Sequence, residues 1–124
     1  MSQGSQKLQK FEDMPLWQDS LEFATKIYKL TSSFPQNEKF GLIPQLRRAA
    51  YSISANVAEG FGIFSKKDKH HFYTIAYGSL LEVKNFLYLA ERLNYLAQTD
   101  LSPLIYSIEL LQKQLNSLMK SIRT

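Results

Sequence analysis

The sequence predicts an all-α protein that folds as an antiparallel four-helix bundle with up-down-up-down topology. Apolar residues recur at spacings of three and four along four segments, at about residues 14–32, 44–60, 66–97 and 100–123. The connections between these segments are short, and short connections place consecutive helices antiparallel in a bundle. No segment shows the alternation of apolar and polar residues that is typical of a half-buried strand.

The chain of 124 residues is long enough for one domain with a single hydrophobic core. Residues 1–12 are largely polar and have no periodic pattern, which predicts a flexible lead before a bundle domain over residues 13–124. Asp13 is expected to cap the first helix. Pro15 fits the first turn of that helix, where amide hydrogens lack partners in any case.

The second helix, over residues 44–60, is the most unusual element of the sequence. Pro44 suits its first turn, and Gly60 and Gly62 suit its end. One face is apolar, but the other faces lack the ordinary charged surface of a solvent-exposed helix. This pattern predicts a helix that packs on more than one side, both within the bundle and against copies of the same chain.

The third helix is predicted to begin after Ser65, because Ser65 can cap it and Asp68 follows three residues later. Gly78 lies in the middle of this helix and suggests either close approach by another helix or a tolerated defect. Thr99 or Ser102 can cap the fourth helix, which then continues to the end of the chain.

The composition excludes several classes of protein. Hydrophobic residues make up 44% of the chain, which argues against disorder, and the absence of cysteine excludes disulfides and thiolate metal sites. No segment resembles a signal peptide, and no apolar run approaches the ~20 residues of a membrane span. We therefore expect a cytoplasmic protein with no membrane partner. The net charge of +4 permits an anionic partner, although it would also serve solubility.

The residues with chemical potential do not form a recognisable catalytic set, so we expect that the protein is not an enzyme. His70 and His71 are adjacent, point in different directions on a helix and cannot chelate one metal ion together. Ser52 and Ser54 have no histidine in the same helix to activate them. No glycine-rich phosphate loop is present, so neither a cofactor nor a small-molecule substrate is expected.

A polar stripe along the second helix has two interpretations. The favoured one is a buried network in which Arg48 pairs with Glu82 of the third helix while Ser52 and Asn56 complete the hydrogen bonds. The alternative is a ligand-binding or catalytic cleft. The predicted network consists of Gln45, Arg48, Ser52, Asn56, Glu59 and Glu82.

Aromatic and basic residues suggest two surfaces. Tyrosines interleaved with cations along the third helix can stack bases, but they are also typical of protein interfaces, and self-association is favoured. The predicted oligomer interface consists of Tyr51, Tyr73, Tyr77, Leu81, Tyr88 and Tyr95. Basic residues at the start of the third helix can contact phosphate or can form a solvated turn. The predicted nucleic-acid contacts are Arg47, Lys66, Lys67, Lys69 and Arg92.

The run FGLIPQLRRAAYSISANVAEGFGIFSKKD and the later run FYTIAYGSLLEVKNFLYLAERL resemble a family of bacterial four-helix bundle proteins. These proteins are encoded in intervening sequences of large-subunit ribosomal RNA genes, and the same family includes the accessory variability proteins of diversity-generating retroelements. The resemblance extends from Leu16 onward. The residues that match its motifs are Gln45, Arg47, Arg48, Ala49, Ala50, Ser52, Ile53, Asn56, Ala58, Glu59, Gly60, Gly78, Ser79 and Glu82.

The resemblance implies a ring-like homopentamer and, in the retroelement branch, a nucleic-acid or reverse-transcriptase partner. Two hypotheses follow for this chain. The first is an oligomeric protein that binds structured RNA or an RNA–protein complex through one continuous basic surface. The second is a protein–protein scaffold that has no nucleic-acid partner.

Overall fold

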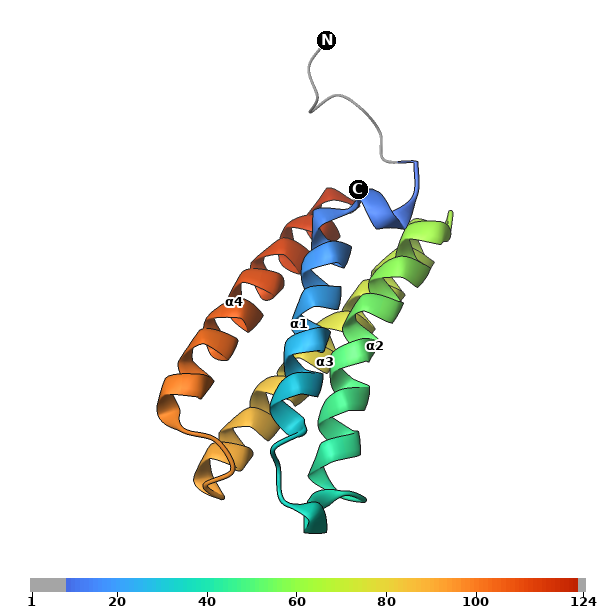
Figure 1. Cartoon of the computed structure of the whole chain (residues 1–124). Helices are drawn as coiled ribbons and strands as arrows, with labels where there is room; N and C mark the ends of the chain where they lie inside the picture. Colours follow the sequence, from blue (N-terminus) through green and yellow to red (C-terminus); the bar gives the residue numbers. More distant parts are fainter. Residues whose placement is uncertain (1–8, 123–124) are drawn as a thin grey trace.

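Four helices run side by side, and each is antiparallel to the next (Figure 1). The computed structural model describes residues 9–122. In chain order the elements are η2 (Phe11–Asp13), α1 (Pro15–Thr31), η3 (Gln36–Glu38), α2 (Leu42–Gly62), α3 (Lys66–Arg92) and α4 (Gln98–Ser121). The predicted all-α four-helix bundle is confirmed. None of the helices in this part of the chain combines the length and the apolar character needed to cross a bilayer.

The helices share one core but do not pack equally. α2 makes the most extensive contacts, first with α3 and then with α1, whereas α1 and α4 touch over few residues. Every helix contributes to the centre, where the fully buried aliphatic side chains include Ile27, Leu46, Ile53, Leu80, Leu87, Ile108 and Leu115. The apolar periodicity of the sequence therefore corresponds to the buried face of each helix.

Gly60 allows α2 to lie close to α3. A Cβ atom at this position would lie 2.5–2.9 Å from three ring atoms of Tyr73. Only 2% of Tyr73 is exposed, so the surrounding core leaves its ring little room to move. The helix continues two residues beyond Gly60, to Gly62. Gly60 is therefore required for packing between helices and does not end its own helix.

The third helix ends at Arg92, five residues before the predicted end at residue 97. Asn94 adopts a left-handed conformation with φ of 63°, which asparagine tolerates better than most residues. The Tyr95 amide donates to the Ala90 carbonyl at 2.8 Å, and the Asn94 amide donates to the Glu91 carbonyl at 3.0 Å. These two hydrogen bonds form a Schellman motif, which ends the helix although the apolar pattern continues.

The other helix ends differ from the predicted ones in smaller ways. α1 follows Met14, which offers no side-chain cap, so the prediction that Asp13 caps α1 is wrong. Ala97 precedes α4 without a side-chain cap, so neither Thr99 nor Ser102 serves that purpose. Ser65 does cap α3, because its Oγ accepts the Asp68 amide at 3.3 Å.

Part of the predicted N-terminal lead has a defined structure. Residues 1–8 lie outside the described part of the chain. Phe11 belongs to η2 and packs edge-on against Trp17, with 5.0 Å between ring centroids. Residues 11 and 12 therefore lie in a short 3-10 helix against the bundle, where the sequence analysis expected a flexible segment.

We expect Gly60→Ala to destabilise the protein by about 1–3 kcal/mol, because overpacking would displace the buried Tyr73 ring. The measurement is the free energy of unfolding in urea. Gly62→Ala is the matched control, since no atom lies within 4 Å of a Cβ at that position. Equal unfolding free energies for the two variants would show that the close approach at Gly60 does not limit stability.

Candidate nucleic-acid interface

The five predicted nucleic-acid contacts lie at opposite ends of the bundle. Lys66 and Lys67 begin α3, whereas Arg92 is its last residue. The helix has 27 residues and is about 40 Å long, because each residue adds about 1.5 Å. Arg47, near the start of α2, lies at the same end as Arg92 (Figure 1). One protomer therefore does not gather these side chains on one continuous surface.

Arg47 binds the end of α1. Its Nε donates to Thr31 Oγ1 at 2.8 Å, and its Nη2 donates to the Tyr28 carbonyl at 3.2 Å. Ser32 Oγ accepts a longer hydrogen bond of 3.4 Å. The last carbonyls of a helix lack partners within the helix and carry partial negative charge, which attracts a cation. Arg47 therefore has a structural role, since its hydrogen bonds join α1 to α2.

Lys69 has the same relation to the end of α2. Its Nζ donates to the carbonyls of Gly60 and Phe61 at 2.9 and 3.0 Å. Partial burial lowers the pKa of Lys69. Two of the five predicted phosphate contacts, Arg47 and Lys69, thus have carbonyl partners within the chain, while Lys66, Lys67 and Arg92 are exposed.

The predicted polar network is smaller than expected. The Ser79 hydroxyl donates to Ser52 Oγ at 2.9 Å, and the side-chain amide of Asn56 (Nδ2) donates to the Ser52 carbonyl at 2.8 Å. The expected pair between Arg48 and Glu82 is absent from the described residues, where Lys84 and Glu109 form the only ion pair, at 3.8 Å. The other four predicted members are exposed to water. An ion pair at the surface would have to order two long side chains, and this entropy cost offsets most of the gain in electrostatic energy. These members are Gln45, Arg48, Glu59 and Glu82.

The predicted tyrosine interface is divided between the core and the surface. Tyr73 is buried against Gly60, and Tyr95 is half-buried and donates its hydroxyl to Glu38, so neither lies open to a second copy. Tyr77 is half-buried as well. Tyr51, Leu81 and Tyr88 are exposed, as an interface would require.

A cleft of about 550 Å³ opens where α1 ends and α2 begins. Its walls carry three cations, Lys39, Arg47 and Arg48, and none of its described lining residues is acidic. We call it the basic cleft. The full lining is Tyr28, Thr31, Ser32, Phe34, Gln36, Lys39, Ile43, Pro44, Arg47, Arg48 and Tyr51. Its volume lies within the range of about 300–1,000 Å³ that is usual for ligand sites.

Aromatic rings accompany the cations of the basic cleft. The Arg47 guanidinium lies over the Tyr28 ring, 4.6 Å from its centroid. Tyr28 and Tyr51 are 41% and 50% exposed, whereas Phe34 is buried. Neither Tyr28 nor Lys39 is among the functional residues predicted from the sequence. The two residues come close to the adjacent arginines Arg47 and Arg48 only when α1 packs against α2, so the local sequence pattern does not reveal this proximity.

Glu38 positions the loop that supplies Gln36 and Lys39 to the cleft. One carboxylate oxygen accepts the Leu42 amide at 2.9 Å and the other accepts the Tyr95 hydroxyl at 2.7 Å. The two hydrogen bonds, that of the Leu42 amide first, lower the pKa of Glu38, and the same bond to Glu38 raises the pKa of Tyr95. Glu38 thereby starts α2 two residues earlier than predicted and ties the loop to the α3–α4 connection.

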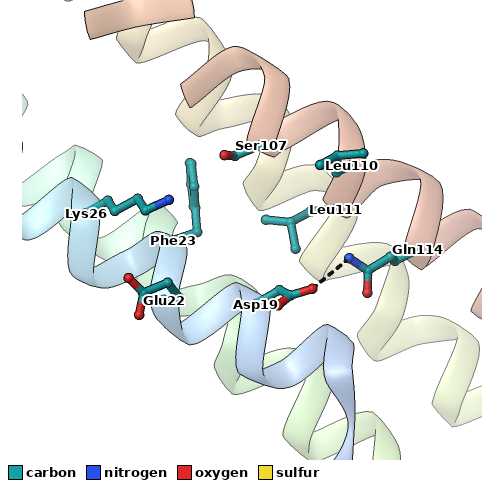
Figure 2. Close-up of a pocket in the computed structure, with 8 residues that line it drawn as sticks. All are labelled: Asp19, Glu22, Phe23, Lys26, Ser107, Leu110, Leu111 and Gln114. Carbon is teal, nitrogen blue, oxygen red and sulfur yellow. Dashed lines mark hydrogen bonds between the residues drawn. The ribbon is translucent and has the colours of Figure 1, made fainter. Parts of the chain in front are cut away.

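A second cleft, of about 230 Å³, lies between α1 and α4 (Figure 2). Gln114 bridges it by donating a 3.1 Å hydrogen bond to Asp19, and Phe23 and Leu111 lie between the two helices. Asp19 and Glu22 give this cleft more negative than positive groups, since Lys26 is its sole described cation. A phosphate would therefore be repelled here and attracted to the basic cleft.

Metal-binding groups are not gathered in the described part of the chain. No three histidine, aspartate or glutamate side chains within residues 9–122 lie close enough together to hold a metal ion. His70 forms a 3.4 Å contact with Thr74 on the next turn of α3.

Comparisons with known proteins agree with the fold. The sequence model of a family described as "23S rRNA-intervening sequence protein" matches residues 12–117. A crystal structure from Bacteroides thetaiotaomicron VPI-5482, described as a protein of unknown function from the S23 ribosomal protein family, superposes with a TM-score of 0.76. The two chains share 27% identity over 85% of this chain and 98% of the other. No curated protein matches the chain.

We expect Glu38→Gln to lower the melting temperature and to weaken its dependence on acid pH. Because the pKa of Glu38 lies below its ordinary value of 4.5, the ionised carboxylate favours the folded state. This contribution is complete above that pH and is lost as the pH falls through the lowered pKa. Thermal unfolding across the acid range measures it, with the exposed Glu82→Gln as control. Parallel pH profiles for wild type and Glu38→Gln would contradict this assignment.

Proposed function

The chain belongs to the family of 23S rRNA-intervening sequence proteins, and from this we propose that it is a non-enzymatic protein that binds structured RNA or an RNA–protein complex. We further propose that it acts in the cytoplasm as a ring-like homopentamer, as its resemblance to that family implies. A reverse transcriptase is a partner only if the chain shares the role of the retroelement proteins.

The observation that carries the RNA proposal is the basic cleft. Three cations line one concavity whose described lining contains no acidic residue, in a chain whose net charge is +4. Concave walls of low dielectric concentrate the potential of such charges and attract a polyanion. The side chains of Lys39 and Arg48 are exposed and have no hydrogen bond or ion pair among the described residues, although Lys39 Nζ lies over the Phe40 ring, 5.5 Å from its centroid. Arg47 adds charge while it stays bound to the end of α1.

The outer face of α3 supports assembly with other copies. Five large apolar side chains on this face are 38–48% exposed, which is unusual for a helix whose opposite face already fills the core. They are Ile75, Leu81, Tyr88 and Leu89 on α3, and Leu93 directly after its last residue. Gly78 lies among them, and a Cβ at this position would meet no atom within 4 Å. A glycine that costs helix stability without serving the protomer's own packing is consistent with close approach by a second copy.

The same apolar face favours the alternative function, a protein–protein scaffold. A different protein could cover the α3 face, and the positive charge would then serve solubility. The two functions differ in their response to nuclease and to salt. RNA bound through phosphate contacts is removed by nuclease and by high salt, whereas a protein partner held by apolar contacts is retained after nuclease treatment.

We expect Arg48→Glu to weaken RNA binding and to reduce its dependence on salt. Loss of one phosphate contact lowers the slope of log K against log salt by about 0.7–0.9. Titrations of a structured RNA at several salt concentrations measure this slope. Lys113→Glu is the matched control, because it removes the same charge from an exposed position on α4 outside the basic cleft.

A further variant, Lys66→Glu/Lys67→Glu, tests the sequence-based alternative at the other end of α3. If this variant loses RNA affinity while Arg48→Glu keeps it, the basic cleft is not the RNA site. If the wild-type protein retains a protein partner after nuclease treatment and binds no RNA at low salt, the scaffold function replaces the RNA proposal.

We expect Gly78→Ala to stabilise the isolated fold by up to about 1 kcal/mol, because alanine is the better helix former and has free space here. The same methyl group should weaken assembly by separating the packed helices. Thermal unfolding reports the first effect, and size-exclusion chromatography with light scattering reports the second. A variant that keeps the wild-type mass at every concentration would show that Gly78 does not lie in the contact between copies.

A further inference from the structure

We propose that the basic cleft binds an unpaired nucleotide, whose base stacks on the exposed tyrosines while its phosphate contacts Lys39 and Arg48. This inference rests on the proposed RNA-binding function and narrows it to single-stranded segments, such as loops or bulges, of a structured RNA. A paired segment would contact the same cations without placing a base in the cleft.

The exposed aromatic rings are the first observation. Tyr28 and Tyr51 line the cleft, and each leaves close to half of its surface open to solvent, so this inference assigns Tyr51 to the cleft and not to the contact between copies that the sequence predicts. An aromatic ring beside cations suits a base, because every base has a π face and is joined to a phosphate. Bases inside a duplex are stacked on their neighbours, so their faces cannot reach a protein ring. Bases in loops, bulges and single strands can.

The second observation is that the Tyr28 ring is held in place. The Arg47 guanidinium covers it at 4.6 Å from the ring centroid and is itself fixed by hydrogen bonds to Thr31 and to the Tyr28 carbonyl. A ring whose orientation is already set loses little conformational entropy when a ligand stacks on it. Arg47 therefore acts mainly as a positioning residue, and because its guanidinium occupies one face of the Tyr28 ring, a base would stack on the other face.

The third observation is that the cations of the cleft differ in whether their side chains already have hydrogen-bond partners. The Arg47 side chain has hydrogen-bond partners within the chain, but the side chains of Lys39 and Arg48 form no hydrogen bond or ion pair among the described residues, and both line the cleft. They come from different elements, the segment before α2 and α2 itself. Gln36 also lines the cleft, and its amide offers both a donor and an acceptor to a base edge.

The experiment compares three ligands of equal length by fluorescence anisotropy on the full chain. The ligands are a single-stranded RNA, its duplex, and a single strand with an abasic sugar–phosphate backbone. Stacking predicts that the base-containing strand binds about 5- to 150-fold more tightly than the abasic strand, the range that one stacked base contributes. The duplex should bind no more tightly than the abasic strand.

Substitution of Tyr51 then tests whether the difference in affinity between the two strands arises in the basic cleft. Tyr51→Ala should lower affinity for the base-containing strand by a similar factor and leave the abasic strand unchanged, while Tyr51→Phe should retain affinity. Tyr106→Ala is the control, since Tyr106 is 64% exposed on α4 and lies outside the cleft. The ligand comparison uses the wild-type chain alone, so it does not depend on how the variants fold.

The outcomes separate this inference from the function on which it rests. Equal affinity for the base-containing and abasic strands, or a duplex that binds as tightly as the single strand, would overturn the stacking inference and leave RNA binding intact. An effect of Tyr106→Ala equal to that of Tyr51→Ala would also overturn it. No binding of any RNA at low salt would instead overturn the proposed function itself.

Discussion

The close packing of α2 against α3 is the constraint on which the rest of the bundle depends. It needs Gly60, because no Cβ fits between the α2 backbone and the Tyr73 ring. Further along the same contact it uses small polar residues, with Ser79 bonded to Ser52 across the helices. α2 also makes the next largest contact, with α1. The packing of α2 therefore sets which side chains of α1 and α3 lie beside its two ends.

Helix ends then determine the chemistry of the surface. Arg47 and Lys69 lie at the ends of α1 and α2, and both donate to carbonyls of the last turn. The consequences differ at the two ends. Lys69 becomes part of the α2–α3 turn, whereas Arg47 covers Tyr28 and leaves its charge in an open cleft with Lys39 and Arg48. One type of contact is therefore a structural cap in one place and part of the candidate ligand site in the other.

Much of the fold could be predicted from the sequence, because the spacing of apolar residues reports which face of each helix is buried. The helix ends were harder to predict, since Glu38 caps α2 from a loop and Asn94 ends α3 within an apolar pattern. The candidate site was harder still. Whether Arg47 is free or bound depends on how the 32–41 connection folds, and local spacing does not contain that information. Lys39 joins the cleft for the same reason.

The sparse contact between α1 and α4 has a consequence for how the molecule folds and opens. Among the four α-helices, every other extensive contact joins neighbours in the chain, so α1, α2 and α3 can assemble through local contacts at low loop-closure cost. α4 has less contact with the other helices than α1, α2 or α3 has, so we expect it to separate from the bundle at the lowest cost. We therefore expect its amide hydrogens to exchange faster than those of α2 and α3, and the cleft that Gln114 and Asp19 bridge lies where α4 would separate from α1.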